Sequence, residues 1–315
     1  MHSSRSVRLS RFRGGSTRPE RSGIALVGLA GIAWGTAPVA FHVVYDRTDL
    51  GAVAISAHRL AIAAAVLLAV VVLHGRLSSV RSELRGRGRS VALVGLGVAG
   101  YQVMWFAAIP HIGVSVATVV SLGLAPILLT AWDGVRRRRR PGAARLAIVC
   151  GAVLGLALIS LSTHSGPDGS TLPALGLALA GASGAMYAVT TVLSRRLAPA
   201  VSTLTLSTST TTIGALALMP VAVLVGPVLT AQPTALLALG YLGVVTMAAG
   251  YWLLFAGLRT TGADSAVIAT LLEPVTATVL ALALLGEHVP PTAFLGMGLI
   301  LVAIAALGSP AAQRR

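Results

Sequence analysis

The chain has 315 residues, of which 55% are hydrophobic and 10% are charged, and its mean hydropathy is +0.85. Soluble domains carry about a quarter charged residues, so this composition excludes a water-soluble globular protein and indicates a lipid environment. The formal net charge of +15 comes from arginine, because the sequence contains no lysine. These arginines are placed as membrane topology requires, so the basic charge does not indicate nucleic-acid binding.

The first 22 residues are rich in arginine and serine, and we expect them to form a disordered basic tail. The apolar stretch that follows, about 23–42, resembles the core of a signal peptide. It is longer than the usual 7–15 residues of such a core, and a similar segment recurs in the second half of the chain. We therefore expect an uncleaved first membrane span.

Ten apolar segments follow one another along the chain, each long enough to cross about 30 Å of hydrocarbon as a helix. They do not alternate as barrel strands do, and backbone groups in lipid must be satisfied within each segment. The expected spans are about 23–42, 51–73, 90–109, 113–132, 142–163, 173–192, 201–226, 234–257, 262–285 and 291–308. The prediction is an all-α integral membrane protein with ten transmembrane helices.

The second half of the chain repeats the first in outline. Phe106–Ile109 falls on Phe255–Leu258 and Gly113 on Gly262, an offset of 149 residues. Five spans in each half is an odd number, so the second copy is inverted, and inverted repeats are typical of transporters that bind substrate at the repeat interface. The expected division is a basic cytoplasmic tail, a first five-helix repeat, an extracytoplasmic linker, a second five-helix repeat and a cytoplasmic tail, at 1–22, 23–163, 164–172, 173–308 and 309–315.

The arginines define the expected topology. If the N-terminus is cytoplasmic, 22 of the 24 arginines lie in inner segments, counting Arg145 at the inner end of its span, and the outer loops hold only Arg47. By the positive-inside rule both termini are then cytoplasmic, in the cell inner (plasma) membrane. The same charge favours anionic lipid headgroups as partners, and no nucleic acid.

The sequence carries no motif for metal binding, catalysis or ATP binding. The single cysteine, Cys150, lies within the fifth span, and the seven histidines lack metal-ligand spacing. We expect no metal, no cofactor, no catalytic residue and no ATP-binding unit, so energy for transport would come from an ion or substrate gradient.

Apart from histidines, two ionisable side chains lie well inside the spans. Arg59 is in the second span, and Glu273 is near the middle of the ninth, directly before Pro274. Such a charge costs at least about 2.5–3.5 kcal/mol at the bilayer centre, so these residues usually face a cavity or a partner. Pro274 removes a backbone donor and loosens the helix beside the carboxylate. Glu273 could hold a proton or a substrate cation, or could pair with Arg59 to fix helix packing; Arg59 could also extend toward the outer headgroups.

Aromatic and amide side chains occur at mid-span depth, away from the interfaces where tryptophan normally collects. They are candidates to line a substrate cavity, although each alone is more often part of core packing. The candidate substrate-binding set, with the two charges, is Trp34, Arg59, Tyr101, Gln102, Trp105, Tyr187, Tyr251 and Glu273. Pro38, Pro126 and Pro274 are the candidate hinges or helix breaks.

Three motifs stand out along the spans: Trp34-Gly35-x-x-Pro38, then His58-Arg59-Leu60, and then Leu272-Glu273-Pro274-Val275 followed by Leu285-Gly286-Glu287 and Gly296. Together they resemble the EamA-type branch of the drug/metabolite transporter superfamily. The resemblance covers about residues 23–308. It implies a ten-helix bundle of two inverted repeats around a central cavity, in a family that moves amino acids, nucleobase-like compounds and other small metabolites, often outward and without ATP. The first repeat departs from the second by carrying Ala125 where the second carries Glu273.

The leading hypothesis is export of a small polar metabolite, such as an amino acid, by alternating access, with protons as a candidate coupling ion. The cavity would be lined by the first, third, fourth, sixth, eighth and ninth spans. One alternative is efflux of lipophilic organic cations, with Glu273 as counter-charge and the aromatic rings as a cation–π cage. Alternatives of another class are an intramembrane enzyme centred on His58 and Arg59, and a substrate-free sensor. The substrate and the oligomeric state are left open.

Overall fold

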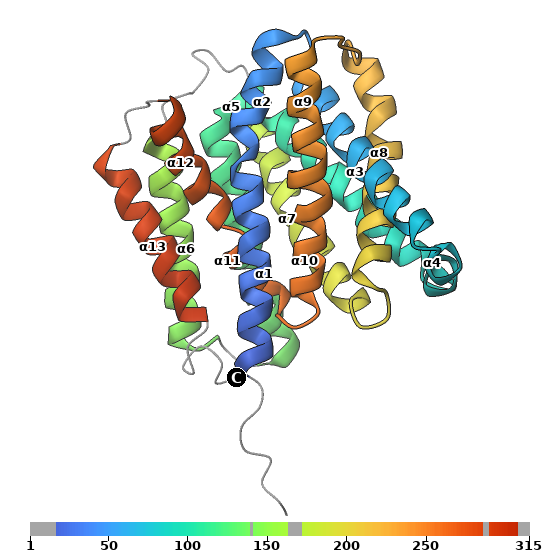
Figure 1. The fold of residues 1–315 in the computed structure, drawn as a ribbon. Coiled ribbons are helices and arrows are strands. Elements are labelled where there is room, and N and C mark those ends of the chain that lie inside the picture. Colours follow the sequence, from blue (N-terminus) through green and yellow to red (C-terminus); the bar gives the residue numbers. More distant parts are fainter. Residues whose placement is uncertain (1–16, 139–140, 163–171, 286–289, 308–315) are drawn as a thin grey trace, which may run out of the picture.

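The computed structural model describes residues 17–138, 141–162, 172–285 and 290–307, and within these ranges all regular structure is helical (Figure 1). The helices are α1 (Thr17–Gly35), α2 (Ala37–Arg47), α3 (Ala52–Leu73), α4 (Leu77–Leu84), α5 (Gly88–Arg137), α6 (Ala143–Ser162), α7 (Pro173–Leu197), α8 (Thr203–Val225), α9 (Pro233–Tyr241), the π-helix η1 (Leu242–Ala249), α10 (Gly250–Leu258), α11 (Ala263–Ala269), α12 (Leu272–Leu285) and α13 (Pro291–Leu307).

The ten-span prediction is confirmed. In the described part of the chain, nine helical stretches are long and apolar enough to cross a membrane. The tenth is α13, whose 17 apolar residues reach about 25 Å at 1.5 Å per residue. Several spans are composite: α1 continues into α2, α9 through η1 into α10, and α11 into α12. The element α5 consists of two helices, one for each of two spans, which meet in a kink at Gly113, where φ is +75°, a conformation that favours glycine.

The first span begins earlier than expected. Helix α1 starts at Thr17, so residues 17–22, which we expected in the disordered tail, are helical. Glu20 in the first turn places a negative charge near the helix N-terminus, where the helix dipole favours it. The remainder of the expected basic tail, most of the linker 164–172 and the C-terminal tail lie outside the described residues.

The two repeats interlock. The second span, α3, packs along the seventh, α8, and the fifth, α6, packs along the tenth, α13. In addition α1 packs along α10 and α12 of the second repeat, and α7 of the second repeat packs along α5 of the first. This reciprocal exchange is the pattern that two copies related by a two-fold axis produce. The start of α1 and the end of α13 lie at the same end of the bundle, as an even number of crossings requires (Figure 1).

Glycines permit a close inter-repeat approach at the helix break that carries Glu273. A Cβ at Gly35 would lie 2.5 Å from the carbonyl oxygen of Glu273, and one at Gly31 would lie 2.9 Å from that of Thr270. The related contact in the other repeat is Gly184 against the carbonyl oxygen of Ser121, also at 2.5 Å. The 149-residue offset maps Gly35 onto Gly184. Each repeat's first helix therefore touches the fourth span of the other copy without an intervening side chain.

Candidate functional site

A cavity of about 330 Å³ lies between the two repeats. It is walled by side chains from α1, α2, α3, α5, α6, α7, η1, α10 and α12. The lining residues are Trp34, Pro38, Arg59, Tyr101, Gln102, Trp105, Phe106, Thr118, Ser121, Leu122, Ile159, Ser160, Ser183, Tyr187, Met247, Tyr251, Glu273, Pro274, Ala277 and Thr278. We expected six spans in this wall; α3 adds Arg59, and α6 adds Ile159 and Ser160.

All eight side chains predicted to bind substrate lie in this wall, and so do two of the three predicted helix breaks, Pro38 and Pro274. The third, Pro126, lies inside α5, where it is buried and takes no part in the cavity wall. The structure thus brings together residues that are up to 240 positions apart in the sequence, from Trp34 to Pro274. Their binding role stays a prediction.

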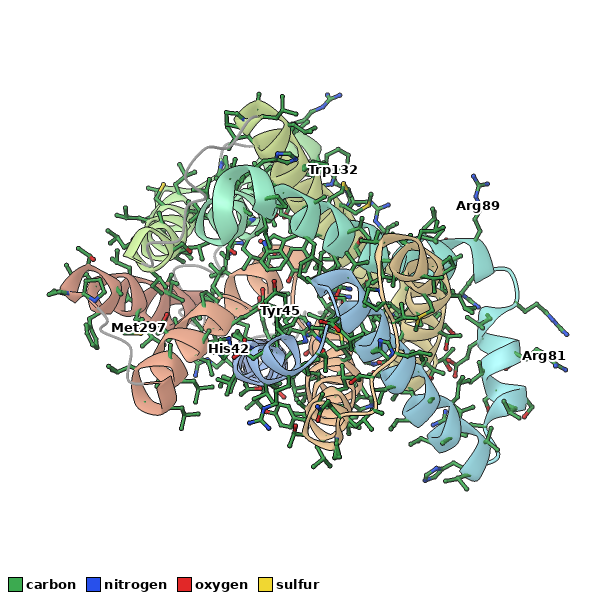
Figure 2. The ribbon with its side chains drawn as sticks, turned by 90° about the horizontal axis from the view of Figure 1, so that it is seen from above. His42, Tyr45, Arg81, Arg89, Trp132 and Met297 are labelled. Atoms are coloured by element: carbon green, nitrogen blue, oxygen red, sulfur yellow. The ribbon has the colours of Figure 1, made fainter. Side chains whose placement is uncertain are left out.

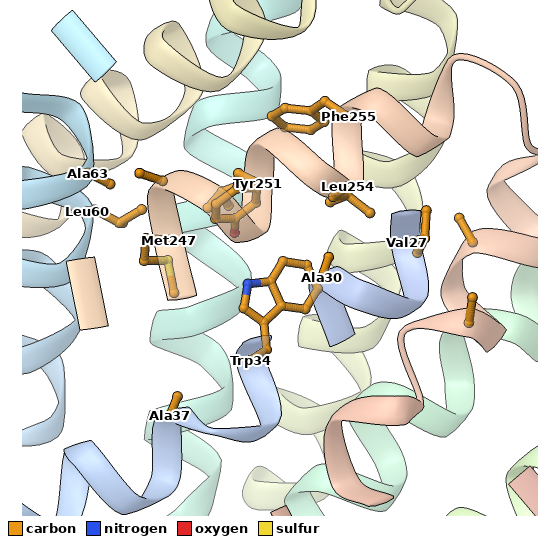
Figure 3. Packing of buried hydrophobic residues seen from close by; sticks show 14 of the residues in the cluster. Val27, Ala30, Trp34, Ala37, Leu60, Ala63, Met247, Tyr251, Leu254 and Phe255 are labelled. Carbon is orange, nitrogen blue, oxygen red and sulfur yellow. The ribbon is translucent and has the colours of Figure 1, made fainter. Parts of the chain in front are cut away.

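The cavity occupies one half of the bundle. Its lining reaches Phe106 and Thr118, on either side of the bend at Gly113, and Ser160 near the end of α6. These positions lie toward the end opposite Thr17 and Leu307. The other half is filled with buried apolar side chains, among them Val27, Leu254 and Phe255 (Figure 3). The arginine distribution predicts that the hollow half faces outward and the packed half faces the cytoplasm, and this orientation stays a prediction.

Arg59 and Glu273 face the same cavity from different repeats, without a direct ion pair between them in the described structure. Their charges still attract across the cavity. One Arg59 nitrogen, Nη2, donates to the hydroxyl of Thr246 at 3.2 Å, and its Nε is buried without a hydrogen-bond partner among the described residues. Because an unpaired buried donor is costly, Arg59 is suited to bind a further acceptor.

Thr246 connects both repeats, and sequence reasoning missed it. Its carbonyl oxygen accepts a hydrogen bond from Trp34 Nε1 at 2.7 Å. Its hydroxyl accepts from Arg59 and donates to the carbonyl of Leu242, 2.5 Å away. Thr246 is fully buried and lies in η1, and π-helical turns inside α-helices frequently occur at functional sites. The first repeat's Trp34 and Arg59 are therefore held by one residue of the second repeat.

Tyrosines form the next part of the wall. The hydroxyls of Tyr101 and Tyr251 are 2.8 Å apart, within hydrogen-bond distance. Tyr187 is 3.1 Å from the hydroxyl of Thr270, to which it donates, because that hydroxyl itself donates to a backbone carbonyl. The ring of Tyr101 meets that of Tyr187 edge-on, with centroids 5.4 Å apart. Ring packing and hydrogen bonds together hold these phenols in fixed positions.

Trp34 lies at the base of the cavity, next to Tyr251, and their rings meet edge-on with centroids 5.7 Å apart (Figure 3). Gly250 makes this approach feasible, since a Cβ there would lie 2.6 Å from Trp34 Nε1. At the outer rim Trp105 meets Phe106 edge-on at 4.8 Å, and Phe106 stacks on Phe41 of α2 at 6.4 Å. Aromatic side chains therefore wall the cavity both at its base and at its rim.

Several small polar lining residues were also missed, because serine and threonine are common in helices and give no sequence signal alone. Ser183 donates to the carbonyl of Tyr101 at 2.8 Å, and Ser121 to that of Ala180 at 3.0 Å. Both bonds join one repeat to the other. Of the predicted polar set, Gln102 turns its Nε2 to the carbonyl of Val98 on its own helix at 3.1 Å.

Comparison with known proteins agrees with this architecture. The chain is 27% identical over 293 residues to the "Uncharacterized inner membrane transporter YicL" of Salmonella typhimurium, covering 92% of this chain and 95% of that protein. It is 28% identical over 214 residues to the "Uncharacterized transporter YwfM" of Bacillus subtilis, covering 68% of this chain and 71% of that protein. A solved crystal structure, described only as that of a protein, matches with a TM-score of 0.76 at 21% identity, over 93% of this chain and all of the other; it shows a shared fold.

The fold and the cavity define a multi-pass membrane transporter. The profile of the EamA-like transporter family matches residues 21–161 and again residues 174–309. The chain therefore belongs to the EamA-like transporter family, as the three sequence motifs indicated. The name of its Salmonella relative places that protein in an inner membrane, which agrees with the predicted location of this one.

Proposed function

We propose that the chain exports a small zwitterionic metabolite, such as an amino acid or a related compound, by alternating access. The observation that carries the proposal is a cavity holding one guanidinium and one carboxylate that are not paired with each other. Arg59 would receive the substrate carboxylate and Glu273 its ammonium group. The aromatic walls would accept the apolar part of the molecule.

The arrangement of the repeats supports the alternating-access step. The cavity lies in the half of the bundle that the arginines assign to the outside, while the inner half is closed by packed apolar side chains. Rocking of one repeat against the other about the Glu273 break would open the inner half and close the outer one. Both termini would stay on the cytoplasmic side throughout.

A second candidate is efflux of lipophilic organic cations. The observation that favours it is the set of aromatic rings beside Glu273, namely Trp34, Tyr101 and Tyr251, because aromatic faces attract cations. A cation substrate would need Glu273 and would tolerate the loss of Arg59. A zwitterion would need both.

The test is a metabolite profile of spent medium from cells that express the wild type, Glu273→Gln or Arg59→Gln, with each protein quantified in the membrane. We expect one amino acid or relative to accumulate with the wild type and with neither variant. An organic cation that still accumulates with Arg59→Gln would establish the second candidate. Identical profiles from all three proteins would overturn both.

A further inference from the structure

The segment between the second and third spans carries a dense positive charge. Residues 76–89 contain five arginines and one acidic residue, Glu83. The arginines are Arg76, Arg81, Arg85, Arg87 and Arg89, and all five are exposed. In the described structure none of them forms an ion pair, and Arg87 donates to the backbone carbonyl of Glu83 at 3.4 Å.

The one acidic side chain of this segment is already engaged. Glu83 Oε2 accepts a hydrogen bond from the backbone N–H of Ser202, the N-cap of α8, at 2.7 Å. Burial raises the pKa of Glu83. Hydrogen bonds from Ser202 and Thr205 and the charge of Arg76 together lower it by more than burial raises it, so the pKa lies below its usual value. Glu83 is thus an ionised anchor for α8, and most of the arginine charge around it stays uncompensated.

Helix α4 lies across the bundle. It is seen nearly end-on in Figure 1 and lengthwise from above in Figure 2, so its axis runs in the membrane plane. Gly75 and Gly86, with φ of +63° and +76°, permit the chain to turn sharply at either end of it. Leu84 packs against the core, which fixes the inner face of the helix.

The outer face of α4 is both apolar and basic. Val72, Leu73 and Leu77 are 54%, 83% and 55% exposed at the inner end of α3 and the start of α4. Arg81, one helical turn after Leu77, extends away from the bundle, and Arg89, at the start of α5, extends from it in another direction (Figure 2). A short in-plane helix with exposed leucines next to these arginines has the character of an interfacial segment. In such a segment the apolar side chains face the lipid acyl chains and the charged side chains face the headgroup phosphates.

We infer that this face is a binding site for anionic phospholipid, in which Arg81 holds the headgroup phosphate and Leu73 and Leu77 contact the acyl chains. Charge complementarity identifies the lipid class, because each arginine near the surface favours acidic headgroups over zwitterionic ones. The exposed leucines distinguish a lipid from a soluble anion. The site lies apart from the cavity and would tie the α3–α5 connection to the leaflet surface.

The test uses the full-length purified protein in detergent, titrated with mixed micelles of phosphatidylglycerol or phosphatidylcholine, with bound lipid counted by native mass spectrometry. The variant is Arg81→Gln. The matched control, Arg136→Gln, removes the same charge from α5, at the same end of the bundle. A Leu77→Gln variant tests the apolar half of the site.

We expect the wild type and the control to retain phosphatidylglycerol over phosphatidylcholine. Arg81→Gln should lose about fivefold in phosphatidylglycerol affinity, and Leu77→Gln should also lose affinity. Unchanged retention by the α4 variant, or an equal loss in the control, would overturn the inference. Displacement of the lipid by an equal concentration of inorganic phosphate would also overturn it, since that outcome marks a plain anion site.

Discussion

The Arg59 guanidinium donates a hydrogen bond to the Thr246 hydroxyl at 3.2 Å, and the same threonine accepts the Trp34 indole N–H at 2.7 Å through its carbonyl. Three residues from three different spans thus meet at one point beside the cavity. Among the described residues Arg59 Nε has no hydrogen-bond partner, and Nη2 bonds a neutral hydroxyl and not Glu273. This arrangement separates the two charges that the proposed function requires.

Thr246→Val should weaken substrate recognition while leaving the fold intact, because valine keeps the shape of threonine but removes the acceptor for Arg59. The loss of one hydrogen bond to a charged group is about 1.5–3 kcal/mol, which corresponds to a rise in KM of about tenfold or more. Thr246→Ser should restore most of the affinity. A Thr246→Val protein with a wild-type KM would show that Thr246 does not position Arg59.

The Tyr101–Tyr251 hydroxyl pair should behave as a unit in stability measurements. Tyr101→Phe and Tyr251→Phe should each lower the free energy of unfolding by about 1 kcal/mol, because each leaves one buried hydroxyl without its partner. The double variant should lose less than the sum of the two. Thermal unfolding in detergent would measure this, and strictly additive losses would mean that the hydroxyls do not interact.

Gly35→Ala should destabilise the protein strongly, because the added methyl group would lie 2.5 Å from both the Glu273 carbonyl oxygen and the Thr276 Cβ. Helix α1 would have to move away from the break that carries Glu273. Gly298→Ala is the matched control, since nothing lies within 4 Å of a Cβ at that helical position. The yield of monodisperse protein and its melting temperature should fall for the first variant alone; equal behaviour of the two would refute the close approach.

Glu83 should make the stability of the protein depend on pH. Its pKa is depressed in the folded state, so its contribution is present above the usual value of 4.5 and is lost as the pH falls through the folded pKa. Glu83→Gln should therefore lower the free energy of unfolding near pH 7 by about 0.3–1 kcal/mol, a small effect because the carboxylate is only partly buried and solvent screens its charge. The deficit relative to wild type should shrink in acid. A deficit of constant size from pH 7 to pH 3 would contradict this account.

Hydropathy and arginine placement were sufficient to predict the ten helices, because lipid imposes one length and one form on each span. Trp34 and Glu273 could be selected as candidates because a tryptophan or a carboxylate at mid-span is unusual. Thr246 could not, since a threonine in an apolar helix carries no signal until its partners in α1 and α3 are placed beside it. The part of α6 in the cavity wall was missed for the same reason: Ser160 is ordinary in sequence.

Local backbone geometry also could not be predicted from the sequence. The sequence of residues 242–249 does not distinguish a π-helix from an α-helix, because the same apolar residues are compatible with either helix type. The in-plane direction of α4 depends on positive φ at Gly75 and Gly86, and glycine permits that conformation without requiring it. The early start of α1 at Thr17 shows that an arginine-rich segment can continue a helix beyond the apolar run.

The most direct test of the central claim is efflux of the compound identified in the medium profile, measured from preloaded vesicles. Wild type would be compared with Arg59→Gln, Glu273→Gln and the combined variant, and with Asp46→Asn as a control at an exposed carboxylate outside the cavity. We expect at least a tenfold loss for each single cavity variant, little further loss when they are combined, and wild-type efflux for the control. Efflux that survives both single substitutions would contradict the claim that these two charges bind the substrate.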